Sequence, residues 1–166
     1  KHFDVSGIPS FIILDENLKV ITDDGRSAVS GDPEGKDFPW LPKPVNDLAG
    51  GPGGINESTS IVLFNPTEEL TTELNNLAQT YWDAAKATGE DPEYAFFTAK
   101  DPSSEIAQRI MSLCKLEAKA GEAQLLLLDI PDEGAYYTWD KAVGAGSLKE
   151  ILEAYTSKSL TRKQLG

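Results

Sequence analysis

Few residues in this sequence could act alone as a nucleophile or a general base. The sequence contains a single cysteine, Cys114, and a single histidine, His2. A thiolate can attack a disulfide, and an imidazole can move a proton at neutral pH. Cys114 shares an apolar helix face with Ile106 and Ile110, so we interpret it as a buried, unreactive thiol. The alternatives are a redox sensor and a cysteine that forms mixed disulfides alone. His2 has no acid or thiol at a recognisable spacing, and we assign it no role.

Two pairs of neighbouring carboxylates could support acid–base chemistry or metal binding. Glu68 and Glu69 fall in the first turn of a predicted helix, where the helix dipole favours negative charge. Asp132 and Glu133 fall in a predicted turn. No second cluster at ligand spacing accompanies either pair. We therefore predict no metal site and no cofactor.

Two further motifs have structural interpretations. Trp82 and Trp139 are predicted to pack in or beside the core rather than bind a cofactor. The glycine-rich run over residues 50–54 lacks a preceding strand and the Lys-Ser/Thr pair of a phosphate-binding loop. Neither motif therefore predicts a ligand site.

The composition restricts the class of partner. The net charge is −12, which repels phosphate backbones and anionic lipid, so we expect no binding to nucleic acid or to membranes. No apolar run approaches the roughly 18 residues of a membrane-spanning helix. A single thiol fits a reducing compartment, so we expect a cytoplasmic and nuclear protein. Because the sequence begins with Lys, we also expect that it continues a longer chain.

Residues 58–166 alternate between strand and helix patterns. Short apolar runs predict strands, and apolar residues at a spacing of three and four predict helices. The first helix ends at Gly89, the second is expected to open at Asp101-Pro102, and Ser147 to Glu150 forms a capping-box pattern for the last. The predicted order is β-α-β-α-β-β-α, with strands near 60–64, 94–99, 122–130 and 135–139 and helices near 67–88, 101–114 and 147–155.

The N-terminal part predicts a hairpin. Phe11 to Leu14 are four consecutive apolar residues after Pro9, which indicates a strand buried on both faces. Residues 15–18 form its loop and residues 19–22 the second strand. The densest run of proline and glycine follows, and we place a linker at residues 49–57. The predicted domains are therefore residues 1–48 and 58–166.

The segment Gly7-Ile8-Pro9-Ser10 resembles the Gly-Ile-Pro-Thr segment of thioredoxin-like proteins, in which the Ile-Pro bond is cis and faces a Cys-x-x-Cys pair. Residues 37–45, Asp-Phe-Pro-Trp-Leu-Pro-Lys-Pro-Val, resemble more specifically the nucleoredoxin family of thiol–disulfide oxidoreductases. Residues 9–15 also align without gaps on residues 123–129. The resemblance implies an α/β, thioredoxin-like fold. Residues 1–48 would be the C-terminal remnant of one such unit, and residues 58–166 a complete second unit.

The resemblance implies a function in which this segment alone is inactive. Gly7, Ile8, Pro9 and Ser10 would dock the substrate peptide, and the catalytic Cys-x-x-Cys would lie upstream. The second unit has Asn65-Pro66-Thr67-Glu68 at the thiol position, so it would be redox-inactive and bind proteins. Implied partners are disulfide-containing clients and signalling proteins, as nucleoredoxin holds the Wnt-pathway protein Dishevelled. The alternative is a purely non-catalytic binding module, like the b-type domains of protein disulfide isomerases.

Overall fold

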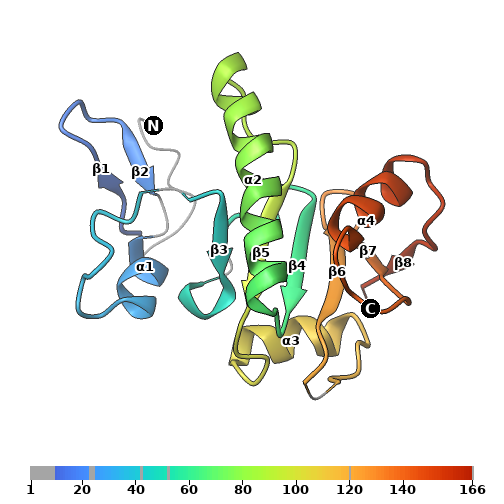
Figure 1. The fold of residues 1–166 in the computed structure, drawn as a ribbon. Helices are drawn as coiled ribbons and strands as arrows, with labels where there is room; N and C mark the ends of the chain where they lie inside the picture. Colours follow the sequence, from blue (N-terminus) through green and yellow to red (C-terminus); the bar gives the residue numbers. More distant parts are fainter. Residues whose placement is uncertain (1–9, 23–24, 42, 52, 120, 166) are drawn as a thin grey trace. The chain divides into compact units, whose positions relative to one another are not determined.

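A computed structural model describes residues 10–22, 25–41, 43–51, 53–119 and 121–165 (Figure 1). The chain divides into two compact units, residues 1–43 and residues 44–166. Each unit is described separately.

The first unit contains the predicted hairpin followed by a short helix. Strands β1 (Ile13–Leu14) and β2 (Val20–Thr22) pair antiparallel, and α1 spans Gly25–Gly31. The Asp15 carboxylate shapes the loop, because its Oδ1 accepts hydrogen bonds from the Asn17 and Lys19 amides at 2.8 Å each. The hairpin is thus confirmed. The prediction that residues 11–14 are buried on both faces is wrong. Only Ile13 is buried among them, because a two-stranded sheet covers little apolar surface.

The second unit is built on a six-stranded sheet with the order β3-β5-β4-β6-β7-β8. Strands β3, β5 and β4 run parallel to one another, and β6, β7 and β8 each pair antiparallel with the preceding strand in that order. The strand bounds are β3 Val45–Asp47, β4 Ser60–Phe64, β5 Ala95–Ala99, β6 Gln124–Asp129, β7 Ala135–Thr138 and β8 Lys163–Gln164. The order of elements predicted for residues 58–166 is confirmed, with β8 added after the last helix.

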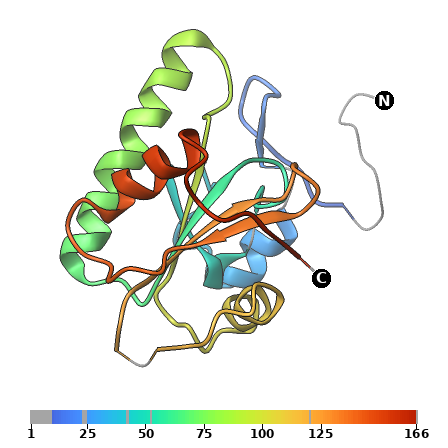
Figure 2. The same ribbon diagram turned by 90° about the vertical axis from the view of Figure 1, so that its right-hand side faces the viewer.

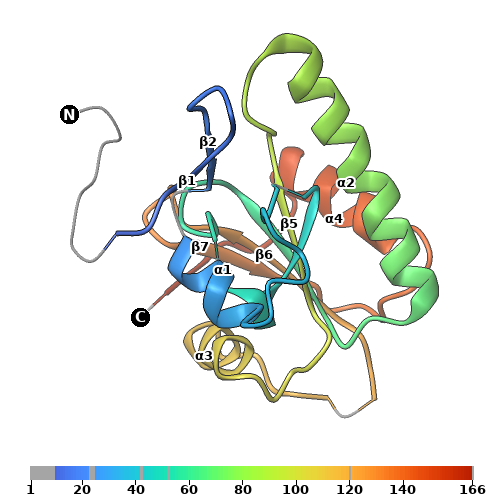
Figure 3. The ribbon, with the colours of Figure 1, turned by 90° about the vertical axis from the view of Figure 1, so that its left-hand side faces the viewer.

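Helices cover both faces of this sheet, and they separate two cores. The long α2 (Glu68–Thr88) and α4 (Ser147–Thr156) pack on one face, against β4 side chains that include Ile61 and Leu63. Helix α3 (Glu105–Leu113) packs on the other face, against Val62 and Phe64 (Figure 2). The view from the opposite side shows the same layering, with α3 apart from α2 and α4 (Figure 3). Every residue of β4 and β6 is buried, which explains their continuous apolar sequences.

The ends of the helices test the predicted caps. Helix α2 begins after Thr67, whose side chain accepts a hydrogen bond from the Leu70 amide, and ends at Gly89 in the left-handed conformation, as predicted. Helix α3 begins three residues later than expected, because Ser104 rather than Asp101 provides the cap. The predicted capping box at Ser147 is wrong. The N-cap residue of α4 is Gly146, which has no side chain to accept a hydrogen bond from the first turn.

The expected domain boundaries also differ from the structure. The second unit begins at Pro44, so β3 and the 3-10 helix η1 (Leu48–Gly50) belong to it rather than to the first segment. The region expected to be a linker contributes to the core, because Ile55 is 6% exposed and packs with Leu48, which is fully buried. The proline and glycine residues of this region concealed the core side chain of Ile55, and those just before it concealed β3 and Leu48.

Candidate redox and docking site

The docking segment inferred from the sequence is described only at its end. Gly7, Ile8 and Pro9 lie outside the described residues, and Ser10 is exposed. The next residue, Phe11, ties this end of the hairpin to α1, since its carbonyl accepts a hydrogen bond from the Gly25 amide at 2.9 Å. A Cβ at Gly25 would lie 2.6 Å from that oxygen, so only glycine allows this approach. The backbone that follows the docking segment is therefore anchored.

The Phe-Pro-Trp motif of the first unit is organised by Asp32, which the sequence analysis missed. One Asp32 carboxylate oxygen, Oδ2, accepts hydrogen bonds from the Asp37 amide at 2.8 Å and from the Trp40 indole Nε1 at 3.0 Å. Hydrogen bonding from the Asp37 amide is the main reason that the pKa of Asp32 is lowered. The turn signal Asp32-Pro33-Glu34-Gly35 could have revealed this role, because Asp favours such loops.

This turn presents apolar side chains to solvent. Phe38 is 63% exposed and Leu41 is 59% exposed. The Phe38 ring packs edge-on against Trp40, with ring centroids 5.1 Å apart. Lys43 pairs with Asp37 at 3.0 Å beside them. An ordered turn with exposed aromatic and aliphatic groups is typical of protein-contacting surfaces.

In the second unit, the corner after β4, which the sequence resemblance aligns with a thioredoxin active site, holds the side-chain amide of Asn65 and no thiol. Asn65 directly follows β4 and has a φ of 48°. Its backbone amide donates a hydrogen bond to the Ala99 carbonyl at 2.9 Å. Its side-chain Nδ2 donates to the Glu122 carbonyl at 3.3 Å. The bond joins the residue after β4 to the segment before β6, which has Ala123 at the position that aligns with Pro9. The corner is closed by a hydrogen bond, and it carries no nucleophile.

The electrostatics of this corner also disfavour a thiolate. Glu68 and Glu69 lie in the first turn of α2, as predicted, where they offset the positive end of the helix dipole. A reactive thiolate requires an electropositive surrounding. The structure therefore confirms the dipole interpretation of this acidic pair.

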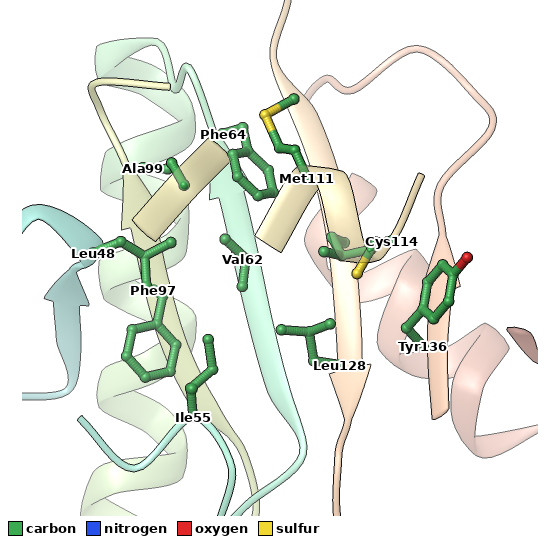
Figure 4. Packing of buried hydrophobic residues seen from close by; sticks show 12 residues of the cluster. Leu48, Ile55, Val62, Phe64, Phe97, Ala99, Met111, Cys114, Leu128 and Tyr136 are labelled. Carbon is green, nitrogen blue, oxygen red and sulfur yellow. The ribbon is translucent and has the colours of Figure 1, made fainter. Parts of the chain in front are cut away.

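Cys114 lies in the core between α3 and the sheet, as predicted. Its side chain is 2% exposed and belongs to the cluster with Met111 and Tyr136 (Figure 4). Burial away from water raises the pKa of the Cys114 thiol to about 12. A neutral, covered thiol does not exchange with disulfides at neutral pH.

The remaining candidates form no additional site. Asp132 and Glu133 lie in the turn between β6 and β7, as predicted. Trp139 packs beside the core, and the Lys141 ammonium lies 4.7 Å from its ring centroid. No group of three or more metal-ligating side chains occurs among the described residues, and His2 lies outside them. In the same part of the chain, no helix combines the length and the apolarity needed to cross a membrane.

The architecture of the second unit defines a class of protein. Three parallel strands, three further strands in antiparallel pairing and helices on both faces form a thioredoxin-like fold. No family model matches the chain.

Curated relatives narrow the class. The chain is 38% identical over 104 residues to nucleoredoxin of Xenopus laevis. The aligned region covers 58% of the chain and 25% of that protein. It is 40% identical over 68 residues to nucleoredoxin of Homo sapiens, covering 40% of the chain and 16% of that protein. The chain is also 31% identical over 107 residues to nucleoredoxin of Danio rerio, and this alignment covers 58% of the chain and 25% of that protein.

About 40–58% of the chain is therefore similar in sequence to nucleoredoxins, and the fold of the second unit is thioredoxin-like. The chain spans a quarter or less of the length of these relatives.

Proposed function

We propose that this chain is part of a thiol–disulfide oxidoreductase, in which residues 7–10 dock the substrate peptide and the unit over residues 44–166 is a redox-inactive protein-interaction domain. The catalytic Cys-x-x-Cys lies upstream of Lys1 in this proposal. The observation that carries it is the site-equivalent corner of the second unit, where Asn65 bonds to the Glu122 carbonyl and no thiol is present. The single cysteine of the chain is buried, so dithiol chemistry has to come from another segment.

The docking role of the N-terminal segment follows from strand addition. A backbone at the start of β1 can pair with an extended peptide, and flanking side chains select its sequence. The exposed Ser10 and the anchored Phe11 carbonyl support this role, since a docking backbone has to be accessible and held in place. By family resemblance, the clients are disulfide-containing and signalling proteins of the Dishevelled type, in the cytoplasm and nucleus.

A disulfide-reductase assay tests this function. The longer natural protein is expected to reduce a protein disulfide with a thiol donor, and the 166-residue chain is expected to be inactive. Pro9→Ala in the longer protein should lower kcat/KM for protein substrates by about tenfold or more, because docking geometry contributes to transition-state binding. Pro33→Ala, at an exposed proline of the same unit, is the matched control. Reduction by the 166-residue chain itself, or a longer protein without Cys-x-x-Cys, would overturn the enzymatic proposal.

A second candidate is a purely non-catalytic binding module, which the absence of thiols at the Asn65 corner favours. It predicts that the longer protein binds its partners equally well when every upstream cysteine is replaced. Cys114→Ala should leave that binding unchanged, because the thiol is covered by the core. Measurable reductase activity in the longer protein would exclude this candidate.

A further inference from the structure

The last strand of the sheet, β8, is attached to β7 by few backbone contacts. It pairs antiparallel through two residues, with Lys163 opposite Tyr136 and Gln164 opposite Ala135. The Leu165 amide extends the pairing by donating to the Gly134 carbonyl at 2.9 Å. An edge strand of this length is close to the shortest that a sheet supports.

Side chains of β8 and of the residue before it provide most of the remaining attachment, and their acceptors are one carboxylate, one hydroxyl and two backbone carbonyls. The Arg162 guanidinium donates from Nε to the Asp132 carboxylate at 3.0 Å and from a terminal nitrogen to the Asp132 carbonyl at 2.9 Å. The Lys163 ammonium donates to the Thr138 hydroxyl at 2.6 Å. The Gln164 amide donates to the Glu133 carbonyl at 3.0 Å. The turn between β6 and β7 thus binds Arg162 and Gln164, and Thr138 at the end of β7 binds Lys163.

One apolar group completes the attachment. Leu165 is half-buried and packs against the core on the α3 side of the sheet. A Cβ added to Gly134 would lie 3.6 Å from the Leu165 Cβ, so the leucine rests directly on the bare backbone of that glycine. The contact set therefore corresponds to the sequence pattern Arg-Lys-x-Leu.

These contacts are weak enough for β8 to open without the rest of the sheet. The side chains of Arg162 and Asp132 are 39% and 52% exposed, so water and salt screen their ion pair. Opening would free the paired groups of β7 and the position of Leu165, and a free strand edge is a template for another extended chain. The net charge of −12 favours the approach of a basic segment.

We propose that the β7 edge with its Asp132 turn is a docking site for an extended basic segment of the pattern Arg-Lys-x-Leu in a partner protein. Residues 162–165 occupy the site within the chain and compete with that partner. The site lies in the second unit, whereas the docking segment belongs to the first, and the proposal is independent of the redox function proposed above.

Fluorescence anisotropy with a labelled peptide tests the proposal. The probe is Ser-Leu-Thr-Arg-Lys-Gln-Leu, the sequence of residues 159–165, and a peptide with Glu in place of Arg is its control. The protein is the full chain, compared with a variant whose own strand is loosened by Arg162→Ala and Leu165→Asp. Because the internal strand competes at a high effective concentration, the loosened variant should bind the probe about tenfold or more tightly than the unchanged chain. Asp132→Asn in the loosened variant should then weaken binding severalfold, and salt should weaken it as well.

Three results would overturn the proposal. The first is a loosened variant that keeps the circular dichroism of the unchanged chain and binds the probe no better. The second is a concentration-dependent dimer of the unchanged chain that the loosened variant lacks, since the occupant would then be the strand of a second copy. The third result comes from hydrogen exchange in the unchanged chain, so it applies even if the variant fails to fold. The Leu165 amide should exchange hydrogen about tenfold or more faster than the Trp139 amide, which donates to the Leu125 carbonyl next to the β6–β7 pairing. Equal protection would mean that β8 does not open separately.

Discussion

The reactivity of Cys114 gives the most direct test of the proposal that the second unit is redox-inactive. Burial raises the pKa of this thiol from 9.0 to about 12. At pH 8 the thiolate fraction falls from about one in ten to about one in ten thousand, a thousandfold decrease. A more basic thiolate is a better nucleophile, with a Brønsted coefficient of about 0.4–0.5, which restores a factor of about twenty. The two effects together slow disulfide exchange by about fiftyfold, and the need for local opening slows it further.

The assay compares the reaction of Cys114 with an aromatic disulfide reagent in native buffer and in denaturant, both at pH 8. We expect the native rate to be slower by about fiftyfold or more. Ser112 offers a matched control, because it is exposed on the same helix. The variant Ser112→Cys with Cys114→Ala should react at nearly the unfolded rate.

The reasoning fails if native Cys114 reacts within about tenfold of the rate in denaturant, since ionisation alone already predicts a larger difference. In that case the thiol would be accessible, and formation of mixed disulfides by Cys114 would return as a function of the second unit. A fast native rate with unchanged circular dichroism would separate this outcome from simple unfolding.

Three further predictions concern stability. Tyr155→Phe should lower the free energy of unfolding by about 1–3 kcal/mol in urea titrations, because the tyrosine hydroxyl donates at 2.6 Å to the buried Asp129 carboxylate, which would keep only the longer hydrogen bond from the Thr59 hydroxyl at 3.3 Å. Glu73→Ala should cost about 0.5–2 kcal/mol, because the Glu73 carboxylate on α2 accepts the Gly146 amide at 3.0 Å and so caps α4; Glu73→Gln keeps an acceptor oxygen and should cost less. The pKa values of Cys114 and Tyr155 are both raised to about 12, so the folded state holds these protons more tightly, and the urea midpoint should be highest below about pH 9 and fall as pH rises toward 12.

The central part of the second unit could be predicted from the sequence because its elements have strong local signals. Strands β4 and β6 are buried on both faces and therefore read as continuous apolar runs. Helix α2 combines apolar periodicity with acids at its start and Gly89 at its end. In each of these elements, the local preference and the tertiary packing agree.

The edges of the sheet could not be predicted, because neighbouring strands define them. Strand β3 covers three residues and β8 two, too few for a period to show. Helix α4 was predicted at its observed position, but its predicted capping box failed for a related reason. Ser147 satisfies the local cap pattern, but the Gly146 amide receives its acceptor from Glu73, which is 73 residues away in the sequence. Such a cap exists only after α2 and α4 have packed together.

The candidate site was predicted in part. The resemblance selected the segments around Pro9 and Trp40, but Asp32 was missed, since its role depends on the folded turn. The docking residues 7–9 lie outside the described residues, so their role stays a prediction. The absence of thiols at the Asn65 corner of the second unit followed directly from the sequence of residues 65–68.

The Asn65 corner explains how a thioredoxin-like unit can keep its fold without its thiols. The side chain of Asn65 links the end of β4 to the segment before β6, and Thr67 caps α2. Neither interaction needs sulfur, and the core residues Leu63 and Leu74 beneath the corner belong to the sheet and to α2. The thiols of a redox site add reactivity to a corner that hydrogen bonds and packing already hold in place. A corner of this kind without thiols therefore lacks dithiol chemistry and still keeps its fold, which is what the proposed binding role of the second unit requires.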